Sequence, residues 1–112
     1  MTGGSAAIYS VYRGDAWHSR IIRNVLPDVL TWLEQVRKSP LQERPDACKP
    51  LAWVILIDAQ SSVLEQYGLL DNRLTDGDRR YTVSDEQMNS LETLFQRHGT
   101  LLEEQQDAPP YL

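Results

Sequence analysis

Residues 51–68, LAWVILIDAQSSVLEQYG, decide the fold, because they fit either one helix or two strands joined by a turn. As a helix, the stretch would be apolar nearly all round its first turns and polar in its second half. As strands, residues 53–57 are rich in β-branched side chains, residues 59–62 (AQSS) form turns readily, and Val63, Glu65 and Tyr67 would alternate along a strand with Leu64 and Gln66. We therefore predict strand, turn and strand, with residues 53–57 as a central strand buried on both faces.

The residues before this stretch predict one strand and one long helix. Residues 7–12 (AIYSVY) form the strand, which Gly14 ends. Asp15 then occupies the N-cap position of a helix over residues 16–38, where apolar side chains recur with helical spacing. Pro27 removes one backbone hydrogen bond from this helix and clashes with the preceding turn, so we expect a kink there, or two helices that meet there.

The residues after the stretch predict a continued meander and a second helix. The Asp-Gly pair at 76–77 is a strong hairpin signal between two short strands. Ser84 and Gln87 then match a capping box at the start of a helix. We expect Gly99 to end this helix in a left-handed conformation, with one further short helical turn directly after it.

These elements make an α+β fold: a small antiparallel sheet in the order β-α-β-β-β-α, with the long kinked helix and the C-terminal helix packed on one face. Residues 1–112 are expected to form a single domain with flexible ends at 1–6 and 107–112. Residues 39–50 contain three prolines and several charges, so we expect an exposed loop there.

Charge is distributed unevenly along the chain. Residues 1–50 carry a net charge of +2, residues 51–83 carry −2 and residues 84–112 carry −5, for a total of −5. An acidic C-terminal face repels phosphate backbones and attracts basic surfaces, so we expect a basic protein partner and no nucleic acid. The alternative is that the acidic surface serves only to keep the protein soluble.

Several classes of protein are disfavoured by the sequence. The longest apolar run, residues 51–57, is far shorter than the roughly 18–20 residues of a membrane-spanning helix, and the N-terminus does not resemble a signal peptide. A single cysteine, Cys48, suits a reducing compartment, so we expect a cytoplasmic protein with no membrane association. Cys48 stands alone and His18 lies far from His98 in the sequence, so we expect no metal and no cofactor.

One carboxylate, Asp58, raises the possibility of catalysis because it ends a buried strand. A carboxylate catalyst needs a second group nearby with a different pKa, and His18 is the candidate for a small hydrolase or transferase. The interpretation we favour is that Asp58 caps the backbone of a turn. A thiol–imidazole pair of Cys48 with His18 is a weaker alternative. We therefore expect no enzyme activity.

The remaining features favour a protein-binding module. Trp32 points sideways from the predicted helix, so it is our candidate for an exposed anchor, the alternative being that it covers the sheet edge. Glu92, Glu103 and Glu104 supply the acidic segment that would meet a basic partner. We expect an inhibitor or immunity-type antagonist of bacterial or phage origin that blocks its partner by occupying its surface. The alternative is a homodimeric chaperone or adaptor for another protein.

Overall fold

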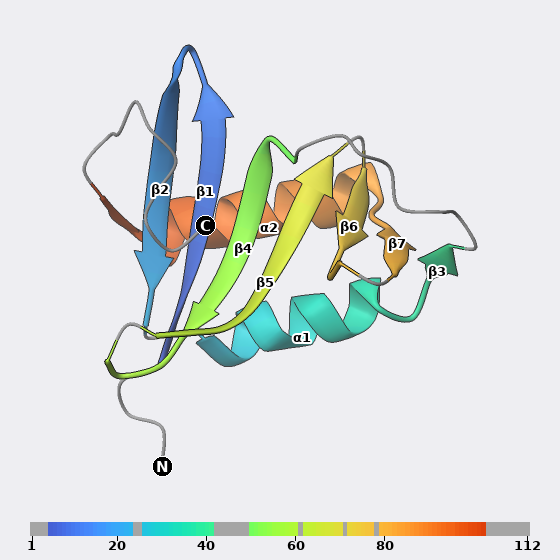
Figure 1. The fold of residues 1–112 in the computed structure, drawn as a ribbon, viewed down its shortest axis with the longest axis horizontal. Coiled ribbons are helices and arrows are strands. Elements are labelled where there is room, and N and C mark those ends of the chain that lie inside the picture. The colour runs from blue at the N-terminus through green and yellow to red at the C-terminus, as the bar shows by residue number, and fades with distance from the viewer. Residues whose placement is uncertain are drawn as a thin grey trace.

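The computed structural model describes residues 5–23, 26–41, 50–60, 62–70, 72–77 and 79–102. The strands are β1 (Ala6–Arg13), β2 (Ala16–Ile22), β3 (Pro40–Leu41), β4 (Ala52–Ile57), β5 (Val63–Leu70), β6 (Arg73–Thr75), β7 (Arg80–Thr82) and β8 (Thr100–Leu101). The helices are α1 (Leu26–Val36) and α2 (Asp85–His98). The strands form one antiparallel sheet in the order β3-β7-β6-β5-β4-β1-β2-β8, and both helices cover the same face of it (Figure 1). The predicted α+β class is confirmed.

The stretch that decides the fold is a pair of strands, as the sequence predicts. β4 pairs with β5 on one side and with β1 on the other, so it lies in the centre of the sheet. Val54 and Ile55 point to opposite faces and are both fully buried. The turn between the strands begins at Asp58, whose backbone N–H donates to the carbonyl oxygen of Ser62.

The segment at 16–22 corrects the prediction of a long helix over 16–38, because it is strand β2 rather than helix. Gly14 and Asp15 have φ angles of 60° and 66°, which are those of a two-residue hairpin turn whose twist matches the strands on either side. Asp15 is therefore part of a turn and not a helix N-cap. Seven residue pairs between β1 and β2 follow from this hairpin. The chain begins with two strands instead of the predicted strand and helix.

Helix α1 is shorter than expected because the proline lies at its start. The helix begins at Leu26, so Pro27 occupies its first turn, where the missing N–H has no hydrogen-bonding role. The predicted kink is therefore wrong. The helix ends at Val36, two residues before the predicted end at Lys38.

Helix α2 begins as the sequence predicts and ends differently. Its capping box is formed by the Gln87 N–H donating to Ser84 Oγ (3.0 Å) and the Ser84 N–H donating to Gln87 Oε1 (2.9 Å). Gly99 has a φ of −83°, so the predicted left-handed cap is wrong. A Cβ on this glycine would collide with the carbonyl oxygen of Phe95, so glycine is required by close approach rather than by φ. The chain then enters β8 and not the expected helical turn.

Both faces of the sheet are apolar. The side toward the helices holds the larger cluster, whose members on the sheet include Ala7, Tyr9, Val54, Leu56 and Leu74. The opposite side holds a smaller buried cluster of Ala6, Ile8, Ile55 and Ile57, against which Leu102 packs.

The predicted ends and loop are corrected where the structure describes them. Ala6 is the first residue of β1 and is buried, so it does not belong to a flexible end. Residues 40–41, which were expected in a loop, form β3 and pair with β7. The hairpin at 76–77 is confirmed by the pairing of β6 with β7. Residues 1–4, 107–112 and 42–49, including Cys48, lie outside the described residues. Neither described helix is long and apolar enough to cross a bilayer.

Candidate functional site

Trp32 is buried and does not form the exposed anchor that the sequence predicts. Its side chain is 8 % exposed, and the indole Nε1–H donates a hydrogen bond of 2.7 Å to the backbone carbonyl oxygen of Gln87. The ring joins α1 to α2. The sequence predicts both helices on one face of the sheet but does not predict that Trp32 lies in the contact between them.

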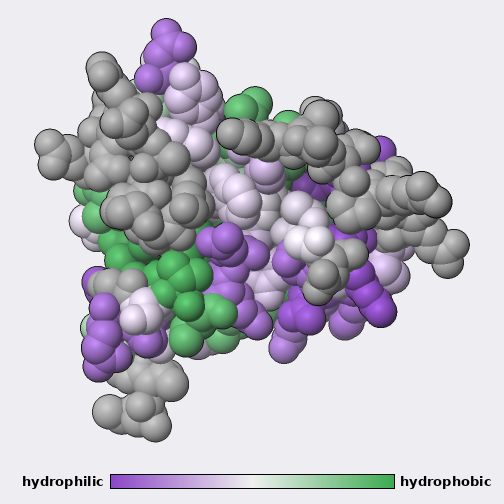
Figure 2. Space-filling model, viewed as in Figure 1, coloured by the Kyte–Doolittle hydropathy of each residue, from purple (hydrophilic) through white to green (hydrophobic). Residues whose placement is uncertain are grey.

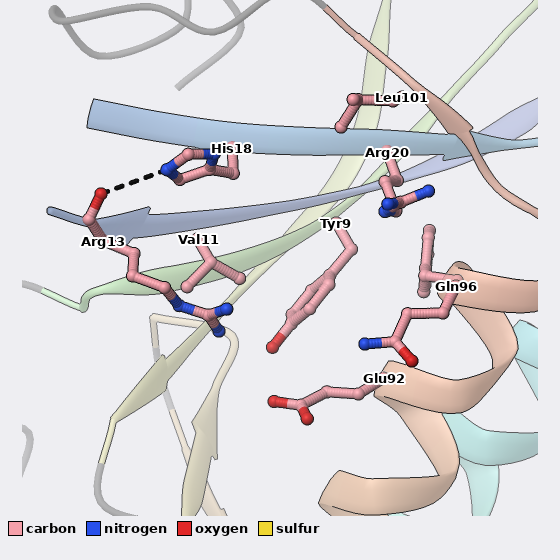
Figure 3. Close-up of a pocket in the computed structure, with 9 residues that line it drawn as sticks. Tyr9, Val11, Arg13, His18, Arg20, Glu92, Gln96 and Leu101 are labelled. Carbon is pink, nitrogen blue, oxygen red and sulfur yellow. Dashed lines mark hydrogen bonds between the residues drawn. The ribbon is translucent and has the colours of Figure 1, made fainter.

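The predicted acidic surface is only partly described. Glu92 is half-buried on α2 and lines a pocket that also contains basic side chains (Figure 3). Glu103 and Glu104 lie outside the described residues.

Asp58 has the turn role that we favoured. One of its carboxylate oxygens, Oδ1, accepts hydrogen bonds of 2.9 Å from the backbone N–H groups of Gln60 and Ser62. These two bonds hold the β4–β5 turn closed, as aspartate commonly does in turns.

Asp58 and His18 do not form a catalytic pair. His18 lies opposite Val11 in the sheet, whereas Asp58 follows Ile57, which lies opposite Ala6. These partners are five residues apart on β1, a separation of roughly 17 Å at the usual rise of a strand. The hydrolase alternative requires contact between Asp58 and His18, and this separation does not allow it. The pair of His18 with Cys48 lies outside the described residues, because Cys48 is not among them.

An apolar hollow lies at the Ala6 end of β1, between the sheet and the first turns of α1. It has a volume of about 170 Å³. Its lining is formed by Ala6, Leu26, Leu30, Leu56, Ile57 and Leu64. Leu30 is 40 % exposed and Leu64 is 59 % exposed. Figure 2 shows hydrophobic side chains gathered at this end of the sheet, at the lower left of the view.

Two carboxylates are close to residues of this apolar hollow along the chain. Glu34 lies one helical turn after Leu30, and Asp58 directly follows the last residue of β4. Glu65 follows Leu64 along β5, but its side chain accepts a hydrogen bond from Tyr67 and lines a different concavity with Arg37. Both glutamates are exposed and Asp58 is half-buried. Arg23, before α1, is the basic residue nearest to Leu26 along the described chain. The described lining of the hollow is uncharged, and Glu34 and Asp58 are the acidic residues close to it along the chain.

A second, polar pocket lies at the other end of β1, where the β1–β2 hairpin projects beyond α2 (Figure 1). Its volume is about 100 Å³. The polar residues of its lining are Tyr9, Arg13, His18, Arg20, Glu92 and Gln96 (Figure 3). His18 Nε2 forms a hydrogen bond of 3.1 Å with the backbone carbonyl oxygen of Arg13.

The phenol of Tyr9 stays protonated in this pocket. Burial raises the pKa of Tyr9 to about 12, the Glu92 carboxylate adds to the rise, and Arg13 opposes it. The hydroxyl is therefore a hydrogen-bond donor over the whole physiological pH range.

A second tyrosine with a raised pKa lies near the C-terminal end of α1. The Tyr67 hydroxyl donates a hydrogen bond of 2.8 Å to Glu65 Oε2. Burial, this hydrogen bond and the charge of Glu65 raise the pKa of Tyr67 to about 12, and Arg37 opposes the rise.

The period-two pattern of a strand could have predicted which residues of the polar pocket lie together on β2. On β2, His18 and Arg20 are two residues apart and so share a face, but the helical interpretation of 16–38 concealed this. Leu30 fits the helical spacing of apolar residues over 16–38, but the buried residues of α1 are 29, 32, 33 and 36. Comparison of the chain with protein-family models, with curated proteins and with solved structures finds no match.

Proposed function

We propose that this chain is a protein-binding module that captures a partner at the apolar hollow. Its action is that of an inhibitor or immunity-type antagonist, which blocks the partner by occupying its surface. The observation that carries this proposal is the exposure of Leu30 and Leu64 around one hollow. Single exposed leucines are ordinary on protein surfaces, whereas apolar side chains grouped around a concavity mark binding sites.

The apolar contribution to binding follows from these exposures. The exposed surface of Leu30 (40 %) and Leu64 (59 %) together equals that of about one whole leucine. Covering one leucine side chain contributes about 1.5–3 kcal/mol, or about tenfold to a hundredfold in affinity. A partner side chain that fills the hollow adds its own burial to this contribution. A leucine, methionine or phenylalanine has the apolar surface that this lining requires.

The charge around the hollow defines the partner further. Glu34 and Asp58, which are close along the chain to the lining residues Leu30 and Ile57, favour lysine or arginine around the inserted apolar side chain. Opposite charges at the rim mainly raise the association rate, and they do so less at high salt. The net charge of the whole chain, −5, also favours a basic partner. We propose a basic partner protein in the cytoplasm, the compartment that a single cysteine favours.

The second candidate is a homodimeric adaptor that uses the same hollow. Its two outer strands, β3 and β8, have two residues each, so pairing of sheet edges between copies is disfavoured. Self-association through Leu30 and Leu64 is the route to a dimer that uses the hollow.

Capture of the partner from the native host tests the proposal. The wild-type chain is compared with the double variant Leu30→Asp, Leu64→Asp and with the control Leu51→Asp, whose leucine is 53 % exposed elsewhere on the surface. The proposal requires that the partner is retained by the control and that its affinity falls by about tenfold or more in the double variant. Equal binding to all three proteins contradicts it.

Two further measurements separate the alternatives. Sedimentation equilibrium identifies the adaptor, because a dimer that dissociates in the double variant places the hollow between two copies. Reversal of Glu34 to lysine tests the electrostatic part, because the association rate must fall and become less dependent on salt. The same reversal at Glu103 and Glu104 measures what the acidic C-terminal segment adds.

A further inference from the structure

The polar pocket is a site that protein capture at the apolar hollow does not use. The two lie at opposite ends of β1: the polar pocket is on the helix-covered side of the sheet, whereas the hollow is lined by residues of both faces at the Ala6 end. Among the described residues that line the polar pocket, Arg13, His18 and Arg20 are basic and Glu92 is acidic. An acidic chain with a charge of −5 therefore gathers basic side chains in one small concavity.

The register of the hairpin forces these basic groups together. Tyr9 lies opposite Arg20 and Val11 lies opposite His18, so the side chains of all four project from the same face toward α2. Arg13 continues this row on β1. Figure 3 shows Tyr9 and Arg13 directed toward Glu92 and Gln96 of α2, whereas the His18 ring is turned along β2 to the backbone carbonyl of Arg13. Like charges on neighbouring strands of one face destabilise a sheet unless a counter-charge is present.

We propose that the polar pocket binds a small oxyanion, the phosphate or carboxylate group of a low-molecular-weight ligand. Guanidinium groups offer paired N–H donors that match both kinds of oxyanion. The Tyr9 hydroxyl and the Gln96 amide add neutral donors from two other directions, one from the strand and one from the helix. The apolar side chains of Val11, Phe95 and Leu101 complete the lining and exclude water from part of it.

The size of the pocket limits the ligand. A volume of about 100 Å³ equals about three waters at the roughly 30 Å³ that each occupies in the liquid. This space holds one phosphate or one carboxylate group, and the rest of a larger ligand would extend into solvent. The pocket therefore encloses one anionic group, which can be part of a larger ligand.

Glu92 acts against anion binding. Its carboxylate lies in the lining, where it lowers the positive potential that the arginines create. Removal of that charge must strengthen anion binding, whereas removal of an arginine charge must weaken it. The two opposite signs make the proposal testable without knowledge of the natural ligand.

Titration of the full chain with inorganic phosphate, followed by the backbone amide signals of residues 9–20 in NMR spectra, measures the binding. Sodium acetate is the second arm and sodium chloride at equal ionic strength is the baseline. We expect saturation at concentrations on the order of 1 mM for phosphate, acetate or both. The arm that saturates identifies the class of oxyanion. Saturation by neither, beyond the chloride baseline, overturns the proposal.

The variants separate a specific site from general attraction. Arg20→Gln and Arg13→Gln should each weaken binding about tenfold, because a charge-assisted hydrogen bond is lost. Glu92→Gln should tighten it about threefold. The control Arg79→Gln removes the same charge from an exposed position on the β6–β7 turn and should leave the affinity unchanged. Equal effects of Arg20→Gln and Arg79→Gln contradict a built site.

Anion binding at the polar pocket and protein capture at the hollow can be tested independently of each other. The double variant Leu30→Asp, Leu64→Asp should bind phosphate or acetate as the wild type does, because the hollow lies at the other end of β1. Circular dichroism of every variant confirms that the fold is retained.

Discussion

The indole N–H of Trp32 and the backbone carbonyl oxygen of Gln87 are 2.7 Å apart, and this hydrogen bond joins the two helices. Gln87 also completes the capping box of α2, so the first turn of α2 is held both by its own cap and by α1. The contact holds the two helices together through residues that are 55 positions apart in the sequence.

Trp32→Phe should lower the free energy of unfolding by about 1–2 kcal/mol. The change removes the hydrogen bond and leaves a small cavity where the larger ring was. Urea unfolding followed by circular dichroism measures the loss. Trp17→Phe is the control, because Trp17 is half-buried against Tyr12 at the outer end of the hairpin, and its loss should be smaller. Equal losses would show that the bond to Gln87 is not stabilising.

Gly68→Ala should destabilise the protein by about 1–3 kcal/mol, the usual cost of overpacking. A Cβ at this position would overlap the ring of Pro50, so one of the two must move. The substitution Pro50→Gly removes the obstacle, and a double-mutant cycle tests the contact directly. The cost of Gly68→Ala should be smaller in the Pro50→Gly background, and an unchanged cost would exclude the clash as its cause.

Gly14→Ala should also destabilise the protein, by about 1–2 kcal/mol, but for a different reason. Gly14 has a φ of 60°, and a Cβ there would meet no atom within 4 Å. The cost is therefore conformational and not steric. Gly14→Asn should recover most of it, because asparagine adopts left-handed backbone conformations more readily than alanine does. Equal stability of the two variants would contradict this explanation.

Stability should fall as pH rises from about 10 to about 12. The pKa values of Tyr9 and Tyr67 are raised to about 12 in the folded chain, whereas the unfolded chain releases these protons near pH 10. Between these values the unfolded state binds fewer protons, so the free energy of unfolding decreases with pH. Below pH 10 both states are protonated and this contribution is fully present.

Urea unfolding at a series of alkaline pH values measures this slope. Tyr9→Phe and Tyr67→Phe remove the titrating groups, so each variant should show a shallower decline than the wild type. A decline that is the same in all three proteins would assign it to other groups.

Local signals in the sequence were enough for half of the fold. The capping box of Ser84 and Gln87, the Asp-Gly hairpin and the β-branched run of β4 each act within a few residues of the chain. Their physical cause is local, since caps and turns satisfy nearby backbone groups and β-branched side chains favour extended backbone. These predictions hold whatever the rest of the chain does.

The segment 16–22 shows why the remainder was missed. Trp17, Ile21 and Ile22 fit the spacing of a helix, and Gly14-Asp15 also fits the start of one. Pairing with β1 decides the matter, because seven residue pairs and a hairpin turn stabilise the strand. The spacing of apolar residues within the segment does not reveal this stabilisation, because it comes from pairing with another strand.

The sequence by itself determined the class of fold, the central strand pair, the capping box of α2 and the Asp-Gly turn. Only the tertiary structure decided that Trp32 is buried, that Leu30 and Leu64 border one hollow, and that Arg20 faces Glu92 across a pocket. The reason is that burial and electrostatic environment belong to pairs of residues distant in the chain, and those pairs exist only after the strands and helices have packed.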